Sequence, residues 1–389
     1  MSNKAKKVLL LIFSVLLVAE LGFLGCQAMG GEPDPTIAPT SGTVAPTETA
    51  TEAPAEVPTE APTEAPTEAP TEAPTEAPTE PPVLYRNVLT GEPLEEPQTT
   101  RLFAITINNV PAALPHYGVS QADLFFEMFI NDYATRGLAF FSDVSKVDRI
   151  GSVRSLRYNF TDLAVAYDAL VGHAGGSNEV MNDAWRSKID HMDVSTGDET
   201  NYSIRYRSGE RSGYSREHCL FAKGAGLYAF AEKKGYRITR DESKTYGLNF
   251  TEDGTPANGE AAGKIDITFN LYGHTKLTTM TYDEELGKYV YTQYGKQIDS
   301  VKEKNLEAFE NVFVIFANTI NKDIYHVADL DGSGKGYYAC GGQIIEVQWH
   351  HEEETDPITF TLTDGTPLTQ GIGNSYIAIV PLKSSVSYK

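Results

Sequence analysis

Short apolar runs rich in aromatic and β-branched residues recur in the first half of the chain and predict buried strands. They cover residues 103–107, 124–130, 137–144 and 169–173. This composition is typical of strands that pack on both faces. Apolar residues at helical spacing predict three helices in the same half: residues 155–168, a segment capped by Ser177 that runs to Ile189, and residues 221–236 ending at Gly235.

The chain changes character after residue 240, where polar and apolar residues begin to alternate. The alternating segments are residues 264–272, 276–283, 288–294, 311–320, 336–350, 358–365 and 375–382. Alternation interrupted by Gly, Asp and Asn predicts an antiparallel sheet, and only residues 300–311 show a helical pattern there.

We therefore expect an α+β fold, in which a mixed α/β N-terminal part packs with a mainly antiparallel β C-terminal part. The boundaries predicted for the two parts are 83–240 and 241–389. The pattern fits two lobes that share one sheet as well as it fits two independent domains.

The first 26 residues have the pattern of a bacterial lipoprotein signal peptide. Three lysines precede the apolar run 8–19, which is too short for a membrane-spanning helix of about 20 residues. Gly25 before Cys26 resembles the end of a lipobox, in which the cysteine is lipidated and becomes the first mature residue. The alternatives are an uncleaved anchor and plain secretion. The prediction is a lipid-anchored protein on the extracytoplasmic face of the cell membrane.

Residues 27–82 predict a disordered tether made of Pro, Thr, Glu and Ala. Five TEAP repeats fill residues 59–78. Proline at every fourth position prevents helix formation, and the segment has no aromatic side chain to bury, so an extended polyproline-like spacer is expected. Such a spacer would hold the folded part away from the membrane.

The charge and the cysteine content of the chain limit the partners and cofactors that can be expected. The formal net charge is −21, and residues 30–80 alone carry eleven acidic residues and no basic one. A nucleic-acid partner is not expected, because phosphate binding needs a surplus of Lys and Arg on some face. Besides Cys26 the chain has only Cys219 and Cys340, and their sequence leaves open whether they pair. No metal or cofactor motif is present, so neither is predicted.

The segment from His173 to Ser177 marks a tight corner between a strand and a helix. Ser177 is expected to cap the helix, and Gly175 and Gly176 to adopt backbone conformations that other residues avoid. A serine nucleophile is disfavoured because the G-x-S-x-G pattern is absent. A third possibility is a ligand-binding rim, since His173 and Ser177 would then point to the same open edge beside a helix N-terminus.

Arginines cluster around this corner despite the negative net charge. Arg136, Arg154 and Arg157 precede it in the chain. Guanidinium groups that converge could bind a carboxylate or phosphate through paired hydrogen bonds. The alternative is that they form ion pairs with Asp123, Glu127 and other acidic side chains nearby in the sequence.

Several long motifs in order resemble the YerB-like lipoprotein family, whose conserved region is a domain of unknown function with N- and C-terminal parts. The motifs are VLTGEPL, AITINNVPAALPHYGVSQADLFFE, TRGLAFFSD, IGSVRSLR, YDALVGHAGGS and GSGKGYYACGGQIIEVQWH. The resemblance implies a bacterial envelope lipoprotein with an α+β fold, and it implies no activity. The positions that match family signature residues are Asn108, Asn109, Ser120, Gln121, Asp123, Arg136, Arg154, Ser155, Arg157, His173, Gly175, Gly176 and Trp349. The chain departs from the family at Leu114, where arginine is usual, and at Ser152, where proline is usual.

The leading hypothesis is a non-enzymatic lipoprotein that binds a polar or anionic envelope ligand, or a protein partner. Polar side chains at strand ends beside a helix start carry this hypothesis. One alternative is a cell-wall hydrolase that uses Asp123 or Glu127 as acid or base. The other is a scaffold for a membrane complex. The ligand-binding residues predicted are Asn108, Asn109, Arg136, Arg154, Arg157, His173, Gly175, Gly176 and Ser177.

Overall fold

A computed structural model describes residues 85–389 except 132–133, 197–201, 206–211, 272 and 298–305. The predicted signal peptide, Cys26 and the tether lie outside the described residues. Within them, no helix has both the length and the apolar character that a membrane span requires.

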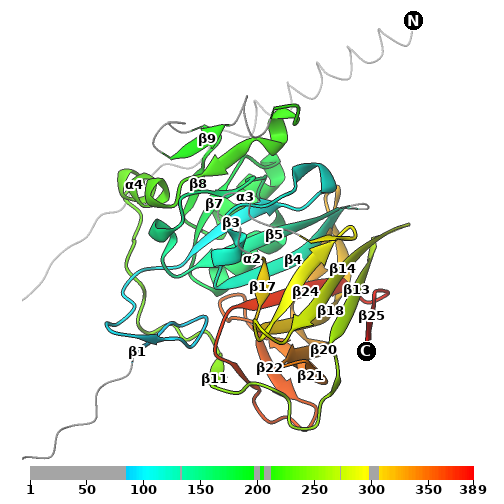
Figure 1. Ribbon diagram of the computed structural model, residues 1–389. Helices are drawn as coiled ribbons and strands as arrows, with labels where there is room; N and C mark the ends of the chain where they lie inside the picture. Colours follow the sequence, from blue (N-terminus) through cyan, green and yellow to red (C-terminus); the bar gives the residue numbers. More distant parts are fainter. Residues whose placement is uncertain (1–84, 132–133, 197–201, 206–211, 272, 298–305) are drawn as a thin grey trace, which may run out of the picture. The chain divides into compact units, whose positions relative to one another are not determined.

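One twelve-stranded mixed sheet forms the centre of the described part (Figure 1). Two strands lie off its main path: β19 (Tyr325–Asp329) pairs with β18, and β22 (Thr359–Leu362) pairs with β21. Along the main path the order is β12 (Glu260–Ala261), β21 (Gln343–His351), β20 (Gly332–Cys340), β18 (Asn311–Lys322), β24 (Ser375–Pro381), β4 (Leu124–Asn131), β5 (Ala134–Phe141), β3 (Phe103–Asn108), β7 (Leu170–His173) and β8 (His191–Asp193).

The two halves of the chain meet in this sheet through β4 and β24. The two strands are parallel, and their register runs from Leu124 opposite Ser375 to Met128 opposite Ile379. Strand β24 is buried along its whole length and is also parallel to β18 on its other side. Both halves of the chain therefore contribute strands to one continuous sheet.

Three α-helices occur in the described part, all among the N-terminal strands (Figure 1). They are α2 (Tyr158–Ala166), α3 (Asn178–Arg186) and α4 (Gly224–Lys234), and they confirm the three helices that the apolar spacing predicts. Ser177 caps α3 by accepting a hydrogen bond from the Val180 amide at 3.4 Å. Helix α4 ends at Gly235, which has the left-handed φ of 72° that favours glycine.

A second, antiparallel sheet covers one face of the central sheet. Its strands are β16 (Lys296–Gln297), β15 (Lys288–Gln293), β14 (His274–Asp283), β13 (Lys264–Leu271) and β25 (Ser385–Tyr388), with β17 (Ala308–Phe309) paired to β15. Aromatic rings fill the space between the sheets: Phe125 and Tyr376 from the central sheet contact Tyr291 and Phe309 from the second. All four side chains are fully buried, and their burial holds the two sheets together.

Short elements complete the fold around these two sheets. They are β1 (Tyr85–Arg86) paired with β2 (Pro93–Leu94), β6 (Ile150–Gly151), β10 (Leu220–Ala222) and β9 (Ser203–Arg205) in a small sheet, β11 (Asn249–Thr251) paired with β23 (Thr369–Gly371), and the 3-10 turns Pro111–Ala113, Val119–Gln121, Val144–Lys146 and Arg216–His218.

The α+β class is confirmed in its broad form, since the described residues are mostly β strands with several sheets. Strand β24 is parallel to both neighbours, so the C-terminal half is less uniformly antiparallel than expected. The helix predicted over 300–311 is wrong where the chain is described, because Ala308 and Phe309 form β17. Phe309 is buried against the aromatic cluster, and this packing outweighs the local helical pattern.

Replacing Gly224 by alanine is expected to destabilise the fold by about 1–3 kcal/mol. A Cβ at Gly224 would lie 1.9 Å from the Val144 carbonyl oxygen and 2.4 Å from that of Val147, so the start of α4 would have to move. Thermal unfolding of Gly224→Ala measures the loss. The exposed position Ala229 on the same helix is the control, and Ala229→Ser should change stability by less than about 0.5 kcal/mol. Equal effects of the two changes would contradict the expectation.

Candidate functional site

Arg136 is a buried guanidinium that has no carboxylate partner in the described part of the chain. It lies on β5 opposite Asn108 of β3, and only 4% of the residue is exposed. Its Nη1 donates to the Ser155 carbonyl at 2.7 Å, while its Nε has no hydrogen-bond partner among the described residues. A buried charge without an opposite charge is costly, so its presence requires an explanation.

The segment 152–157 brings two further arginines to Arg136. It crosses the end of β3, where the Asn108 amide donates to the Ser152 carbonyl at 2.9 Å. It then passes the corner after β7, where the Leu156 amide donates to the Gly175 carbonyl at 2.9 Å. These backbone hydrogen bonds attach the segment to the ends of β3 and β7, which are parallel neighbours in the central sheet. The attachment fixes the positions of Arg154 and Arg157.

Arg154 and Arg157 are more accessible than Arg136. Arg154 forms an ion pair of 3.0 Å with Glu217, whose side chain is 53% exposed. Arg157 lies over the Tyr325 ring, with its guanidinium carbon 5.0 Å from the ring centroid. Within the described part of the chain, neither Arg136 nor Arg157 has a carboxylate at ion-pair distance.

The positive charges of neighbouring arginines lower the pKa values of Arg136 and Arg157. Burial, together with the charges of Arg157 and Arg154, holds the pKa of Arg136 well below its usual value. Burial also lowers the pKa of Arg157, an effect partly offset by Tyr325 and increased by Arg154. An arginine still keeps its proton at neutral pH. We call Arg136, Arg154 and Arg157 the arginine cluster. Among the described residues, its one carboxylate partner is the exposed Glu217.

Asn108 lies beside the arginine cluster, whereas Asn109 does not. The Asn108 amide nitrogen is 2.9 Å from Nδ1 of His218, the residue after Glu217. Asn109 hydrogen-bonds to Glu127 on the opposite face of the sheet. Successive residues of a strand point to opposite faces, which explains why the two asparagines separate.

An open hollow of 440 Å³ adjoins this region at His218. Its other lining residues come from the turn after β3 and from the chain before the 3-10 turn at His218: Pro111, Ala112, Leu114, Ser212, Gly213, Tyr214 and Ser215. Leu114, one of the two departures from the family pattern, is therefore part of this hollow. Of the lining residues, His218 contacts Asn108, and none of the three arginines lines the hollow.

His173 does not lie on an open rim, and this part of the sequence prediction is wrong. The residue is fully buried; its Nδ1 is 3.0 Å from the Gly175 carbonyl and its Nε2 is 2.9 Å from Nδ1 of His191. The parallel pairing of β7 with β8 places His191 against it. Burial lowers the pKa of His173 to about 4, so the ring is neutral at pH 7 and adds no positive charge to the arginine cluster.

The two glycines of the corner have different roles. Gly175 has a φ of 70°, as predicted, and a Cβ there would meet no atom within 4 Å. Gly176 does not have a positive φ; a Cβ there would approach the Met181 sulfur at 2.9 Å. Ser177 is occupied as the cap of α3. The structure therefore brings together Asn108 and the three arginines, with Gly175 alongside through its backbone bond to Leu156.

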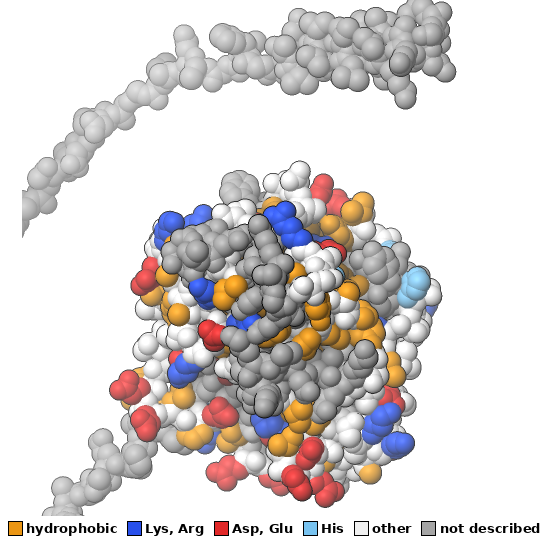
Figure 2. Space-filling model, turned by 45° about the horizontal axis from the view of Figure 1, so that its top comes forward, with side chains coloured by type: hydrophobic (Ala, Val, Ile, Leu, Met, Phe, Trp, Pro, Cys, Tyr) orange, Lys and Arg blue, Asp and Glu red, His pale blue; other side chains and the backbone are white. Residues whose placement is uncertain are grey.

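Basic side chains do not form an extended surface on the face shown in Figure 2, where they are interspersed with acidic ones. A second hollow, of 630 Å³, lies between residues 253–258 and 362–369 of the C-terminal half. Its charged lining residues are acidic, namely Asp253, Glu346 and Asp364. This hollow is thus poorly suited to an anion, in contrast to the arginine cluster.

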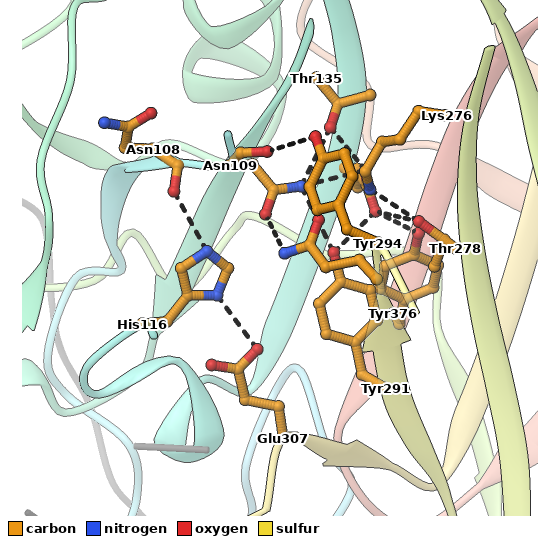
Figure 3. Close-up of polar contacts among 12 residues, drawn as sticks. Asn108, Asn109, His116, Thr135, Lys276, Thr278, Tyr291, Tyr294, Glu307 and Tyr376 are labelled. Carbon is orange, nitrogen blue, oxygen red and sulfur yellow. Dashed lines mark hydrogen bonds and ion pairs between the residues drawn. The ribbon is translucent and has the colours of Figure 1, made fainter. Parts of the chain in front are cut away.

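Glu127 is the centre of a buried polar network between the two sheets. Figure 3 shows its partners, among them Lys276, Tyr291 and Tyr376, close together. Its Oε1 accepts from Lys276 Nζ, from Thr135 Oγ1 at 2.7 Å and from Asn109 Nδ2 at 3.0 Å. Its Oε2 accepts from the hydroxyls of Tyr376 at 2.7 Å, Tyr291 at 2.9 Å and Thr278 at 3.2 Å.

The carboxylate of Glu127 is stabilised in its charged form by these contacts. Burial alone would raise the pKa of Glu127, but the charge of Lys276 and the hydrogen bonds lower it. Burial lowers the pKa of Lys276, against the charge of Glu127. The pair is shielded from water, since Lys276 is 2% exposed and Glu127 is fully buried.

Asp123 and Glu127 do not form a pair of cooperating carboxylates. Asp123 accepts from the Ser142 amide at 2.5 Å and from Asn87 Nδ2 at 3.2 Å, and burial raises its pKa. Glu127 has a separate set of partners in the interface between the sheets. A hydrolase that uses both residues in one cleft is not what this geometry favours.

Sequence reasoning missed Glu217, His218, Tyr325 and Lys276 as parts of these sites. The first three reach the arginine cluster from distant segments, and no local pattern marks them. Lys276 did carry a signal: with Thr278 and Met280 it occupies the inward-facing positions of β14. A lysine on the apolar face of a strand requires a buried partner.

The remaining candidate chemistry is limited. Among the described residues, no group of three or more His, Cys, Asp or Glu side chains is placed to hold a metal ion. Cys219 and Cys340 are both buried thiols. Burial raises the pKa of Cys340 to about 11, which makes it a poor nucleophile at neutral pH.

Models of two domains match most of this fold. "Protein of unknown function (DUF3048) N-terminal domain" matches residues 89–237, and the corresponding C-terminal domain matches residues 265–377. The chain belongs to this family. The matched segments contain the arginine cluster and the whole Glu127 network.

Known relatives agree with this assignment. This chain is 28% identical, over 297 residues, to the protein named "Putative lipoprotein YerB" of Bacillus subtilis (strain 168). The match covers 75% of this chain and 85% of that protein. The crystal structure of the YerB protein from Bacillus subtilis matches with a TM-score of 0.66 at 26% identity, covering 78% of this chain and 99% of that one. The resemblance stated from sequence motifs is thereby confirmed.

His173 is expected to remain neutral down to about pH 4 in the folded protein. Because its pKa is lowered on folding, His173 contributes stability above its unfolded pKa of about 6.5, and this contribution is lost as the pH falls toward 4. Titration of the histidine ring protons by NMR measures the value, with His173→Gln assigning the resonance. A midpoint near 6.5 would show that the ring is exposed.

Proposed function

We propose that this family member is an extracytoplasmic lipoprotein whose folded part binds an anionic group at the arginine cluster. Lipidation at Cys26 anchors it to the membrane, and residues 27–82 hold the folded part away from the bilayer. The lipobox-like sequence and the name of the Bacillus subtilis relative support the anchor.

The uncompensated charge of Arg136 carries the binding proposal. Arg136 is almost completely buried, two further guanidinium groups lie close to it, and Glu217 is the one carboxylate that pairs with the cluster within the described residues. Removing arginine charges from water without counter-charges is unfavourable, so an anion bound between them would recover free energy. A purely structural arginine would more economically face an aspartate or glutamate.

The ligand is a phosphate or carboxylate group of an envelope component. Arg154 and Arg157 are the partly exposed groups and contact the anion directly, because a guanidinium can donate two parallel hydrogen bonds to such a group. Arg136 lies beneath them; it holds the Ser155 carbonyl and adds positive potential. A protein partner would present the same chemistry through an acidic side chain.

A scaffold in a membrane complex and a cell-wall hydrolase remain the competing functions. The hydrolase has the weaker support, since Glu127 is sealed inside the fold and Asp123 is bonded elsewhere. A scaffold needs no small ligand, and so the binding experiment below separates it from the proposal.

The double change Arg154→Gln and Arg157→Gln is expected to weaken anion binding by at least about tenfold, because two charge-assisted contacts are lost. Inorganic phosphate and succinate are the probes, and the rise in unfolding temperature with probe concentration reports affinity. Arg237→Gln is the matched control, since Arg237 is paired with Asp168 away from the cluster. If neither probe stabilises the unchanged protein, or if all variants respond alike, the binding proposal is wrong.

Changing Cys26 to serine is expected to release the protein from the membrane fraction. Serine cannot form the thioether of a lipidated cysteine, so the amino-terminal anchor is lost. Fractionation of cells expressing the full chain, with Cys219→Ser as the matched control, measures the distribution. Retention of the Cys26→Ser protein in membranes would favour the uncleaved anchor.

A further inference from the structure

Three side chains with the chemistry of amide formation meet at one oxygen atom inside the fold. Lys276 supplies an amine, Asn109 a carboxamide and Glu127 a carboxyl group. Lys276 Nζ and Asn109 Nδ2 both hydrogen-bond to Oε1 of Glu127, the latter at 3.0 Å (Figure 3). The amine and the amide therefore share a single proton acceptor.

Burial favours the neutral, nucleophilic form of the Lys276 amine. Lys276 Nζ lies 5.3–6.0 Å from the ring centroids of Phe269, Tyr294 and Tyr291. Burial lowers the pKa of Lys276, which makes the neutral amine easier to reach. Transfer of one proton from Lys276 to Glu127 replaces two buried charges by two neutral groups. Burial favours that exchange, whereas the charge of Lys276 and the hydrogen bonds that lower the pKa of Glu127 oppose it.

The carboxamide of Asn109 is held and polarised. Gln293 Nε2 donates a hydrogen bond of 2.5 Å to Asn109 Oδ1. The Tyr294 hydroxyl donates to the Asn109 backbone carbonyl at 3.0 Å, which fixes the residue at the end of β3. A donor at the carbonyl oxygen stabilises the negative charge that develops there when a nucleophile adds to the carbon.

We propose that Lys276 and Asn109 become joined by an intramolecular amide bond, with Glu127 as the catalytic proton carrier. Lys276 Nζ attacks Asn109 Cγ after giving a proton to Glu127. Glu127 passes this proton to Nδ2 and accepts the second proton that Nζ loses as it becomes an amide nitrogen. The Cγ–Nδ2 bond breaks, and ammonia leaves. The new Nζ–Cγ bond balances the bond that is lost, and no oxidant, reductant or cofactor is needed.

The bond would join the two sheets covalently. Asn109 follows β3 of the central sheet and Lys276 belongs to β14 of the second sheet. The competing account is a permanent ion pair between Lys276 and Glu127. A buried ion pair adds little net stability over apolar packing, so stability does not distinguish the two accounts. The mass of the tryptic peptides does, because only the amide bond links them and releases ammonia.

The test is the mass of peptides from the full chain, folded and then digested with trypsin under denaturing conditions. Without the bond, trypsin releases peptide 102–136, which contains Asn109, and cleaves after Lys276. With it, peptides 102–136 and 265–288 appear as one species, about 17 Da lighter than their sum because ammonia has left. Fragmentation spectra must place the link at Asn109 and Lys276.

Single substitutions test which side chains are needed to form the bond. Lys276→Arg keeps the positive charge but lacks a primary amine, and Glu127→Gln cannot carry the proton, so both should lose the linked species. Lys264→Arg, at an exposed lysine on the same hairpin, should retain it. Separate, full-mass peptides from the unchanged protein overturn the proposal even if the variants fail to fold. A linked species about 18 Da lighter, with the bond at Glu127 and water lost, also overturns it.

Discussion

The parallel pairing of β24 with β4 is the constraint on which the rest of the molecule depends. It places residues 375–379 beside residues 124–128, which are 251 positions earlier in the chain. Tyr376 comes opposite Phe125 and Ala378 opposite Glu127. A shift of one residue would move every side chain of β24 to the other face of the sheet. This register lets the Tyr376 hydroxyl reach Glu127 and lets the Tyr376 ring contact Tyr291 and Phe309 of the second sheet.

Strand β5 lies between two groups of charged side chains on opposite faces of the sheet. Thr135 points to the Glu127 network and Arg136 to the arginine cluster, because neighbouring residues of a strand face opposite ways. On the first face every charge has its counterpart, and the site is closed to water. On the second face positive charge exceeds negative charge, and two of the three arginines are partly exposed. The contrast is why the first face suits a permanent internal reaction and the second suits a ligand that comes and goes.

The local sequence pattern predicted those helices and strands whose buried apolar residues recur at regular spacing. The three helices and the strands around residues 103–107, 124–130 and 375–382 appear where their apolar spacing places them. The helical pattern at 300–311 failed because the described end of that segment pairs with β15. The cap at Ser177 was predictable, since capping uses only residues within one turn. The burial of His173 was not, because it depends on β8, which contributes His191.

The sequence by itself determined the membership in the family, the α+β class and the presence of many arginines in a strongly acidic chain. It also indicated an N-terminal lipobox and a tether, neither of which needs a partner elsewhere in the chain to be recognised. Only the tertiary structure decided that Arg136, Arg154 and Arg157 converge with Glu217 as their one carboxylate partner among the described residues, while Glu127 meets Lys276. The reason is physical: spacing along a strand sets which face a side chain occupies, but the charge it meets there comes from segments brought close by long-range register.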